Sequence, residues 1–193
     1  MWRLTQGQTQ QVGSSSRRYH TMPVFVLYLK AEQEGVAKWG NTPGSPWCVS
    51  LEEQGEVKED MFIDPSNEEE VNGNLFNFVF RFDGARKQST VNVLAPNDKK
   101  CKGVFKDAGE DAGWWSAEAA TKYGDDGFVP VAAFEMRGCE LKSWSKAGTR
   151  AVVVTEGGTA FEDVELHEDW CEYDEENDAS VQLLEVEFKV DTV

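Results

Sequence analysis

The chain has 193 residues, a length that suits one large domain or two small halves sharing a core. Hydrophobic residues make up 40% and aromatic residues 11%, enough for a packed interior, and no apolar run approaches the length of a membrane span. Against 35 Asp and Glu there are only 19 Lys and Arg, and the net charge of -16 disfavours nucleic acid and anionic membranes, because both require cationic contacts.

The first 21 residues differ from the rest of the chain. They are rich in Gln, Ser and Thr, contain Arg3, Arg17 and Arg18, and have no acidic residue. This composition resembles a mitochondrial or plastid transit peptide, although its helical amphipathicity is poor. The alternative is a disordered tail, or an over-extended start with Met22 as the original initiator.

From residue 22 the pattern predicts strands separated by turn signals. The strand that begins at Val24 is apolar on both faces, which is typical of a strand covered on both sides. Gln54-Gly55 supplies turn chemistry between two strands and predicts a hairpin. A period of two in Phe76, Phe78, Phe80 and Phe82 places an aromatic row on one strand face. The predicted strands are 24–29, 47–51, 57–63, 75–82 and 89–94, with loops at 35–46 and 64–74.

Residues 97–127 are the least regular part. One or two turns of helix are expected at 116–122. The segment also carries the only basic cluster of the chain, which lies close to aromatic residues, a combination that can bind single-stranded nucleic acid. The shortness of the run and the acidic surroundings favour a solvated loop instead. The cluster consists of Lys99, Lys100, Lys102 and Lys106.

Strands resume after the irregular segment. The total of about ten short strands with evenly spaced turns predicts an all-β fold with few short helices, either a sandwich or an incomplete barrel. The predicted strands of this part are 128–136, 141–144, 150–155, 164–166 and 181–190.

Four cysteines occur, and none belongs to a CxxC pair. Zinc held by four thiolates needs ligands in close pairs, so such a site is not indicated. The chain has neither the cysteine density of a disulfide scaffold nor a secretory signal with an apolar core. We therefore expect free thiols and a cytoplasmic protein, with the mitochondrion or a plastid as the alternative if the first residues are a transit peptide. The cysteines are Cys48, Cys101, Cys139 and Cys171.

Three phrases follow one another in the second half. F-x-x-R-G begins at Phe134, G-T-x-F-x-x-V-x-L at Gly158, and D-W-x-x-Y-D-E at Asp169. With the strand that starts after Met22, this order resembles the eukaryotic CXXC-motif zinc-binding protein family. The resemblance covers about residues 22–193, and the biochemical role of that family is largely unassigned.

The resemblance implies two similar β halves related by internal duplication, here residues 22–96 and 97–193, in one compact unit. In that family one half holds zinc between two hairpin turns, each contributing a CxxC. By order along the chain, the turns fall here at 52–55 and 81–84. No Cys or His stands there, so the resemblance implies a member that has lost its zinc ligands and carries no cofactor. The degenerate positions are Glu53, Gln54, Arg81 and Gly84.

An arginine at a former thiolate position repels a cation. We expect Arg81 to pair with Glu53 across the two turns and to replace the metal with a salt bridge. If both side chains are exposed, such a pair contributes only about 0–1 kcal/mol, so most of the stability should come from the phenylalanine row. A relocated zinc site is the alternative, if the fold brings Cys139, Cys171 and His167 together.

Residues 151–188 contain no Lys or Arg. We expect their carboxylates to form an exposed acidic surface that captures a protein partner, either basic or metal-handling, because a dense negative surface steers cationic partners. The run from Asp174 to Asp178 lacks the alternation and the glycine of a calcium-binding EF-hand loop. The partner-binding candidates are Glu172, Asp174, Glu175 and Glu176.

Catalysis has little support in the sequence. His167 is the only histidine outside the first 21 residues, and a Ser/His/Asp triad needs an oriented base. No nucleotide-binding glycine pattern is present. We therefore expect a non-catalytic interaction protein, with a relocated metal site as one alternative and an uncharacterised enzyme as another.

Overall fold

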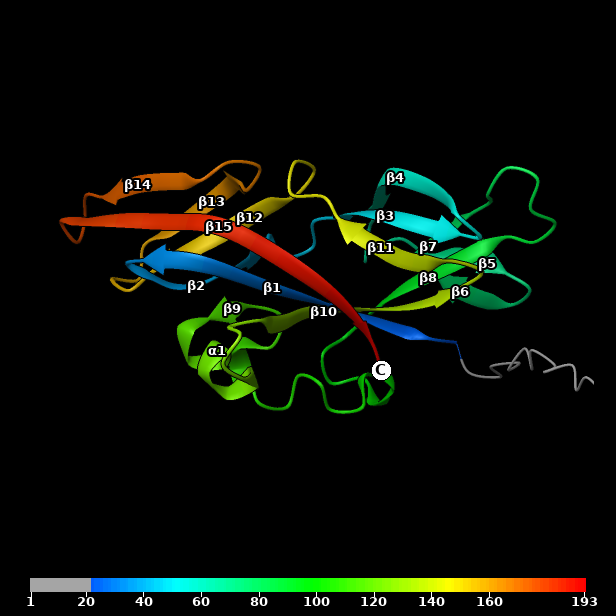
Figure 1. Cartoon of the computed structure of the whole chain (residues 1–193), viewed down its shortest axis with the longest axis horizontal. Helices are drawn as coiled ribbons and strands as arrows, with labels where there is room; N and C mark the ends of the chain where they lie inside the picture. Colours follow the sequence, from blue (N-terminus) through cyan, green and yellow to red (C-terminus); the bar gives the residue numbers. More distant parts are fainter. Residues whose placement is uncertain (1–21) are drawn as a thin grey trace, which may run out of the picture.

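The computed structural model describes residues 22–193, so the expectations for residues 1–21 lie outside the described part of the chain (Figure 1). The one α-helix within that range is α1, Ala117–Tyr123, which confirms the helix expected at 116–122. Its first turn is capped by the Ser116 hydroxyl, which accepts a hydrogen bond from the Ala119 N–H at 3.1 Å. No helix between residues 22 and 193 is long and apolar enough to cross a membrane.

Two short 3-10 helices occur at Lys99–Cys101 and Gly109–Asp111, and the rest of the regular structure is β, which confirms the predicted class. The strands are β1 Val24–Glu34, β2 Val36–Asn41, β3 Trp47–Glu53, β4 Glu56–Ile63, β5 Glu69–Val71, β6 Asn74–Phe76, β7 Phe78–Phe80, β8 Ser89–Leu94, β9 Trp115–Ser116, β10 Val129–Arg137, β11 Glu140–Trp144, β12 Arg150–Thr155, β13 Ala160–Glu165, β14 Trp170–Asp174 and β15 Ala179–Thr192.

A six-stranded sheet runs the length of the molecule in the order β14-β15-β1-β10-β8-β7 (Figure 1). Its long central strand β1 is antiparallel to β15 and to β10. Two smaller sheets flank it, β13-β12-β2-β9 at one end and β11-β3-β4 at the other, and β5 pairs with β6 in a separate hairpin. Three of these four sheets contain strands from both sides of residue 96. The internal duplication stays a prediction.

Strand β1 packs against apolar residues on both faces of the six-stranded sheet. Leu27 and Leu29 enter the main core, while Val24 and Val26 pack on the other face with Cys101 and Phe105. The expectation that this strand is covered on both faces is therefore confirmed.

Several predicted boundaries are wrong. The expected loop at 35–46 contains β2, whose Trp39 is fully buried; glycine, asparagine and proline at its end hide the strand pattern. The acidic loop at 64–74 contains β5, and the acidic stretch after residue 168 contains β14. Strands β5 and β14 lie at sheet edges, where polar side chains interrupt the hydrophobic pattern that would indicate a strand.

The strand predicted at 75–82 is interrupted at Asn77. The Asn77 side-chain amide donates to the carbonyls of Pro65 and Asn67, both at 2.9 Å, and its Oδ1 accepts from the Val93 N–H at 2.8 Å. This side chain replaces ladder hydrogen bonds and ties the β5–β6 hairpin to β8. The predicted aromatic row is present from Phe78 to Phe82. The ring centroids of Phe78 and Phe80 lie 5.3 Å apart, and those of Phe80 and Phe82 lie 5.0 Å apart.

Candidate functional site

The two turns singled out in the sequence lie side by side. Gln54-Gly55 joins β3 to β4 with positive φ at both residues, 52° and 89°, as a tight hairpin requires. The second turn follows β7, and an open depression separates the two. It is lined by Glu53, Gln54, Glu56, Phe82, Asp83, Gly84, Ala85, Arg86 and Lys87.

A lysine connects these turns. Lys58 Nζ lies 3.4 Å from Asp83 Oδ1 and 3.9 Å from Glu56 Oε1. The Asp83 N–H donates to Glu56 Oε1 at 3.3 Å, and Lys58 Nζ lies 5.9 Å from the centroid of the Phe82 ring. The Phe82 side chain is 2% exposed and belongs to the main core, so an apolar anchor lies beneath the polar clip.

The expected pair between Arg81 and Glu53 does not form. Arg81 is exposed and makes no ion pair within residues 22–193; its side chain lines a cavity on the other side of the turn. Lys58 makes the connection instead, since it extends from β4 directly toward Asp83. Lys58 could not be identified from the turn residues alone, because it lies in strand β4.

The side chains at the two turns do not fit zinc. Lys58 brings a positive charge to their centre, and Gln54 and Gly84 offer no thiolate or imidazole. In the part of the chain that the structure describes, no group of three or more His, Cys, Asp or Glu side chains is arranged to hold a metal ion.

Cys139 is the thiol closest to this region. It lies in the turn between β10 and β11 and lines a depression together with Glu53 and Gln54. It is buried, and burial, with the negative charges of Glu53 and Glu140, raises the pKa of the Cys139 thiol to about 12. A thiol with this pKa is protonated at neutral pH and is a poor metal ligand and nucleophile.

The structure does not bring the three relocated-site candidates together. Cys171 is exposed on β14, at the other end of the molecule from the β10–β11 turn (Figure 1). His167 lies in the connection between β13 and β14, where its Nδ1 is 3.4 Å from Glu165 Oε2. All four cysteines are free thiols, as expected from the sequence.

The acidic segment forms the edges of two sheets, β13 and β14. Ten exposed carboxylates lie between residues 156 and 178, and we refer to them as the acidic face. Within residues 22–193 the one arginine or lysine that pairs with them is Arg150, which contacts Glu165. The members are Glu156, Glu162, Asp163, Glu165, Glu168, Asp169, Glu172, Glu175, Glu176 and Asp178.

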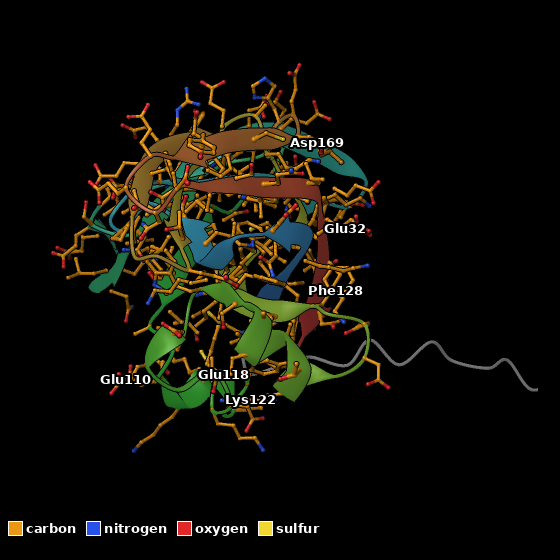
Figure 2. All side chains as sticks on the ribbon, turned by 90° about the vertical axis from the view of Figure 1, so that its left-hand side faces the viewer. Glu32, Glu110, Glu118, Lys122, Phe128 and Asp169 are labelled. Carbon is orange, nitrogen blue, oxygen red and sulfur yellow. The ribbon has the colours of Figure 1, made fainter. Side chains whose placement is uncertain are left out.

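Figure 2 views this end of the molecule. Asp169 lies on the β14 side of the end, and Glu118 and Lys122 of α1 lie on the opposite side. The acidic face therefore occupies one side of the end rather than all of it.

Asp174 is not a partner-facing residue, contrary to the expectation. Its side chain is 1% exposed and accepts hydrogen bonds from the hydroxyls of Thr155 at 2.8 Å and Thr159 at 2.9 Å, and from the Asn177 amide at 2.9 Å. Burial acts to raise the pKa of the Asp174 carboxyl, but the hydrogen bonds from Asn177, Thr155 and Thr159 outweigh it, so the pKa is lowered. The other three candidates, Glu172, Glu175 and Glu176, are exposed.

The second and third sequence phrases meet in space. Thr159 contacts Asp174, and the ring of Phe161 packs edge-on against that of Trp170, with centroids 5.3 Å apart. Asp169 Oδ1 accepts from the Glu185 N–H at 3.0 Å. These residues hold β13, β14 and β15 together, so the second and third phrases contribute to the packing of these strands.

These features define an all-β protein with two adjacent turns at one end and an acidic face at the other. The chain belongs to the family described as CXXC motif containing zinc binding protein, eukaryotic, whose profile matches residues 26–191. A comparison with curated proteins found no match.

Two solved structures share the fold. One is described as the crystal structure of C1orf123, with a TM-score of 0.70 and 22% identity over 88% of this chain and 99% of the other. The second is a hypothetical protein from Plasmodium falciparum, with a TM-score of 0.68 and 20% identity over 87% and 99% of the two chains. Neither the family description nor these titles point to catalysis.

Proposed function

We propose that this family member is a non-catalytic interaction protein that captures a basic protein partner on the acidic face. The observation that carries the proposal is the concentration of ten exposed carboxylates around β13 and β14, in a segment without any Lys or Arg. A one-sign patch of this density accelerates encounter with a cationic partner and repels anionic competitors.

One aromatic side chain gives this surface more than charge. Tyr173 on β14 is 48% exposed, and its hydroxyl donates a hydrogen bond to the Asp178 carboxylate. Aromatic groups of this kind act as anchors at interfaces, where they bury large areas at low entropic cost. Tyr173 would support short-range contact after electrostatic encounter.

The test uses a lysine-rich peptide of about 15 residues as probe, and measures its binding by fluorescence anisotropy at several salt concentrations. Reversing Glu172, Glu175 and Glu176 to lysine should weaken binding by at least about tenfold at low salt. Asp174 is left intact, because its replacement would perturb the fold.

The matched control reverses three exposed glutamates elsewhere, Glu59, Glu70 and Glu110, to lysine. It changes the net charge by the same amount and should weaken binding by less than about threefold. Equal losses in the two triple variants would show that overall charge, and not the acidic face, attracts the peptide, and the proposal would be wrong.

We further propose that this chain has lost the zinc site of its family and that the Lys58–Asp83 contact and buried Phe82 hold the two turns together in its place. The support is the chemistry around the two turns, where Lys58 of β4 contacts Asp83 and no residue of either turn is a Cys or His, as a metal cage would need. Metal content of protein purified without chelator, together with melting curves with and without EDTA, tests this proposal. Near-stoichiometric zinc with a lowered Tm in EDTA would contradict it.

A further inference from the structure

A second cavity lies behind the turn that carries Arg81. It has a volume of about 350 Å³ and is bounded by the β5–β6 hairpin, the segment after β7 and the adjoining faces of β8 and β10. This volume suits a compact small molecule. The lining residues are Val71, Asn72, Asn74, Phe76, Arg81, Arg86, Lys87, Gln88, Thr90 and Arg137.

The charge of this cavity is opposite to that of the molecule. Arg81, Arg86, Lys87 and Arg137 line it, and no carboxylate does. Carboxylate partners are found for many other cations, including Lys30, Lys100 and Arg150, yet none of the four forms an ion pair within the described range. The chain has a net charge of -16, yet these four cations lie together without an acidic neighbour. They create a local positive field that no carboxylate in the described range neutralises.

A buried hydroxyl adds an independent observation. Thr90 on β8 is 4% exposed and lines the cavity, and its buried Oγ1 has no hydrogen-bond partner among residues 22–193. Buried hydroxyls in folded proteins are almost always hydrogen-bonded, because an unpaired one loses its hydration without compensation. A ligand oxygen in the cavity would supply the missing partner.

The strand register brings the hydroxyl and one guanidinium to the same spot. Thr90 of β8 is directly opposite Arg137 of β10, so their side chains leave the same face of the sheet. Arg81, Arg86 and Lys87 come from the segment after β7, on the neighbouring side of the cavity. The Asn77 hydrogen bonds hold the hairpin that forms the remaining wall.

We propose that this cavity binds a small phosphate-bearing compound. Arginine forks match the oxygen spacing of phosphate and donate two hydrogen bonds at once. The Thr90 hydroxyl lies in the same wall and would donate a further hydrogen bond after its side chain rotates toward the cavity. Phe76 and Val71 provide an apolar wall for the organic part of the ligand. The site is distinct from the acidic face and does not depend on the proposed partner.

Isothermal titration with inorganic pyrophosphate as probe tests the charged part of the site. We expect saturable one-to-one binding that is weakened at least tenfold by Arg137→Gln and by Arg86→Gln. Two variants are used because Arg137 lies in a sheet strand and Arg86 in a connecting segment, so a folding defect in the first leaves the second informative. Lys122→Gln, on α1 at the other end of the molecule, is the matched control and should bind as the wild type does (Figures 1 and 2).

Absence of saturable binding, or an equal loss in the Lys122→Gln control, would overturn the proposal. A nucleoside monophosphate and a sugar phosphate, titrated in parallel with pyrophosphate, distinguish the sources of the phosphate. Inorganic phosphate is titrated in the same series as the matched probe without an organic part. Tighter binding of an organic monophosphate than of inorganic phosphate would support contact with the apolar wall, and the reverse order would contradict that contact.

Thr90→Val separates ligand binding from folding. Removing an unpaired buried hydroxyl should leave the Tm unchanged or raise it, while the affinity for pyrophosphate falls at least threefold. An unchanged affinity in a folded Thr90→Val protein would exclude the hydroxyl from the site.

Discussion

At the scale of single residues, Asp174 shows how an acidic residue can serve the fold rather than the surface. It lies in a run of carboxylates, yet it is the one that turns inward and accepts hydrogen bonds from two threonines and an asparagine. A carboxylate that accepts several hydrogen bonds is stabilised in its charged form. Sequence position alone could not separate it from exposed Glu175, because both occur in the same polar stretch.

We expect Asp174→Asn to lower the Tm by at least about 3 °C at neutral pH, because the neutral amide leaves at least one hydroxyl or amide donor without an acceptor. The exposed neighbour Glu175→Gln should change the Tm by less than about 1 °C. Differential scanning calorimetry measures both. Equal shifts would contradict the structural role of Asp174.

The contribution of Asp174 to stability depends on pH with a defined sign. The pKa of Asp174 is lowered from its ordinary value of 3.8, so its contribution to stability is complete above that value and is lost as the pH falls through the folded-state pKa. The Tm difference between wild type and Asp174→Asn should therefore be constant from pH 7 to about pH 5 and shrink below about pH 4. A difference that grows on acidification would contradict this sign.

Thiol reactivity should separate the cysteines by burial. Cys171 is exposed, whereas Cys48, Cys101 and Cys139 are buried and their pKa values are raised mainly by that burial. In the native protein at pH 8, a disulfide reagent should modify one thiol quickly and the other three only after unfolding. Cys171→Ser should abolish the fast phase and Cys139→Ser should retain it; a second fast thiol would contradict the assignment.

At the scale of elements, the two adjacent turns are held by one buried ring and one polar clip. We expect Phe82→Ala to lower the free energy of unfolding by about 3–5 kcal/mol, because it opens a cavity in the main core. Lys58→Ala should cost only about 0–1 kcal/mol, since the Asp83 side chain is 92% exposed and the contact is screened by water. Urea unfolding of both variants checks this order, and a larger loss in Lys58→Ala would reverse the roles.

The sequence predicts elements well where the apolar pattern is strong. The hairpin of β3 and β4, strand β8 and the long strand β10 lie where the alternation and the turn residues place them. Three strands could not be predicted: β2, whose apolar pattern ends in Gly40 and Asn41, and the edge strands β5 and β14, whose pattern is broken by carboxylate side chains. The interruption of the predicted strand at Asn77 could not be predicted for a different reason. Its side-chain amide replaces ladder hydrogen bonds only in the folded hairpin.

The candidate sites were harder to predict than the strands. The positions of the two turns followed from chain order, but the partner of Asp83 did not, because Lys58 comes from the middle of a strand. The basic cavity could not be predicted either. It combines Arg137 with residues some fifty positions earlier, and only the β8–β10 register brings Arg137 opposite Thr90.

At the scale of the whole molecule, β1 depends on partners that are remote in sequence. It pairs along most of its length with β15, from Phe25 opposite Thr192 to Glu34 opposite Gln182. A chain ending at residue 178 lacks β15 and should fail to give a cooperative melting transition, because β1 and β14 lose their shared neighbour. A Gly-Ser insertion after the exposed Gly44 is the control and should melt cooperatively; a cooperative transition in the truncated chain would show that β15 is dispensable.

The same pairing has a consequence for synthesis on the ribosome. Strand β1 emerges early, but its two neighbours in the sheet begin at residues 129 and 179. Through most of translation this apolar strand has no partner, and an unpaired strand edge readily joins another chain. We therefore expect the yield in cells to depend on the supply of nascent-chain binding factors until the final strand is made.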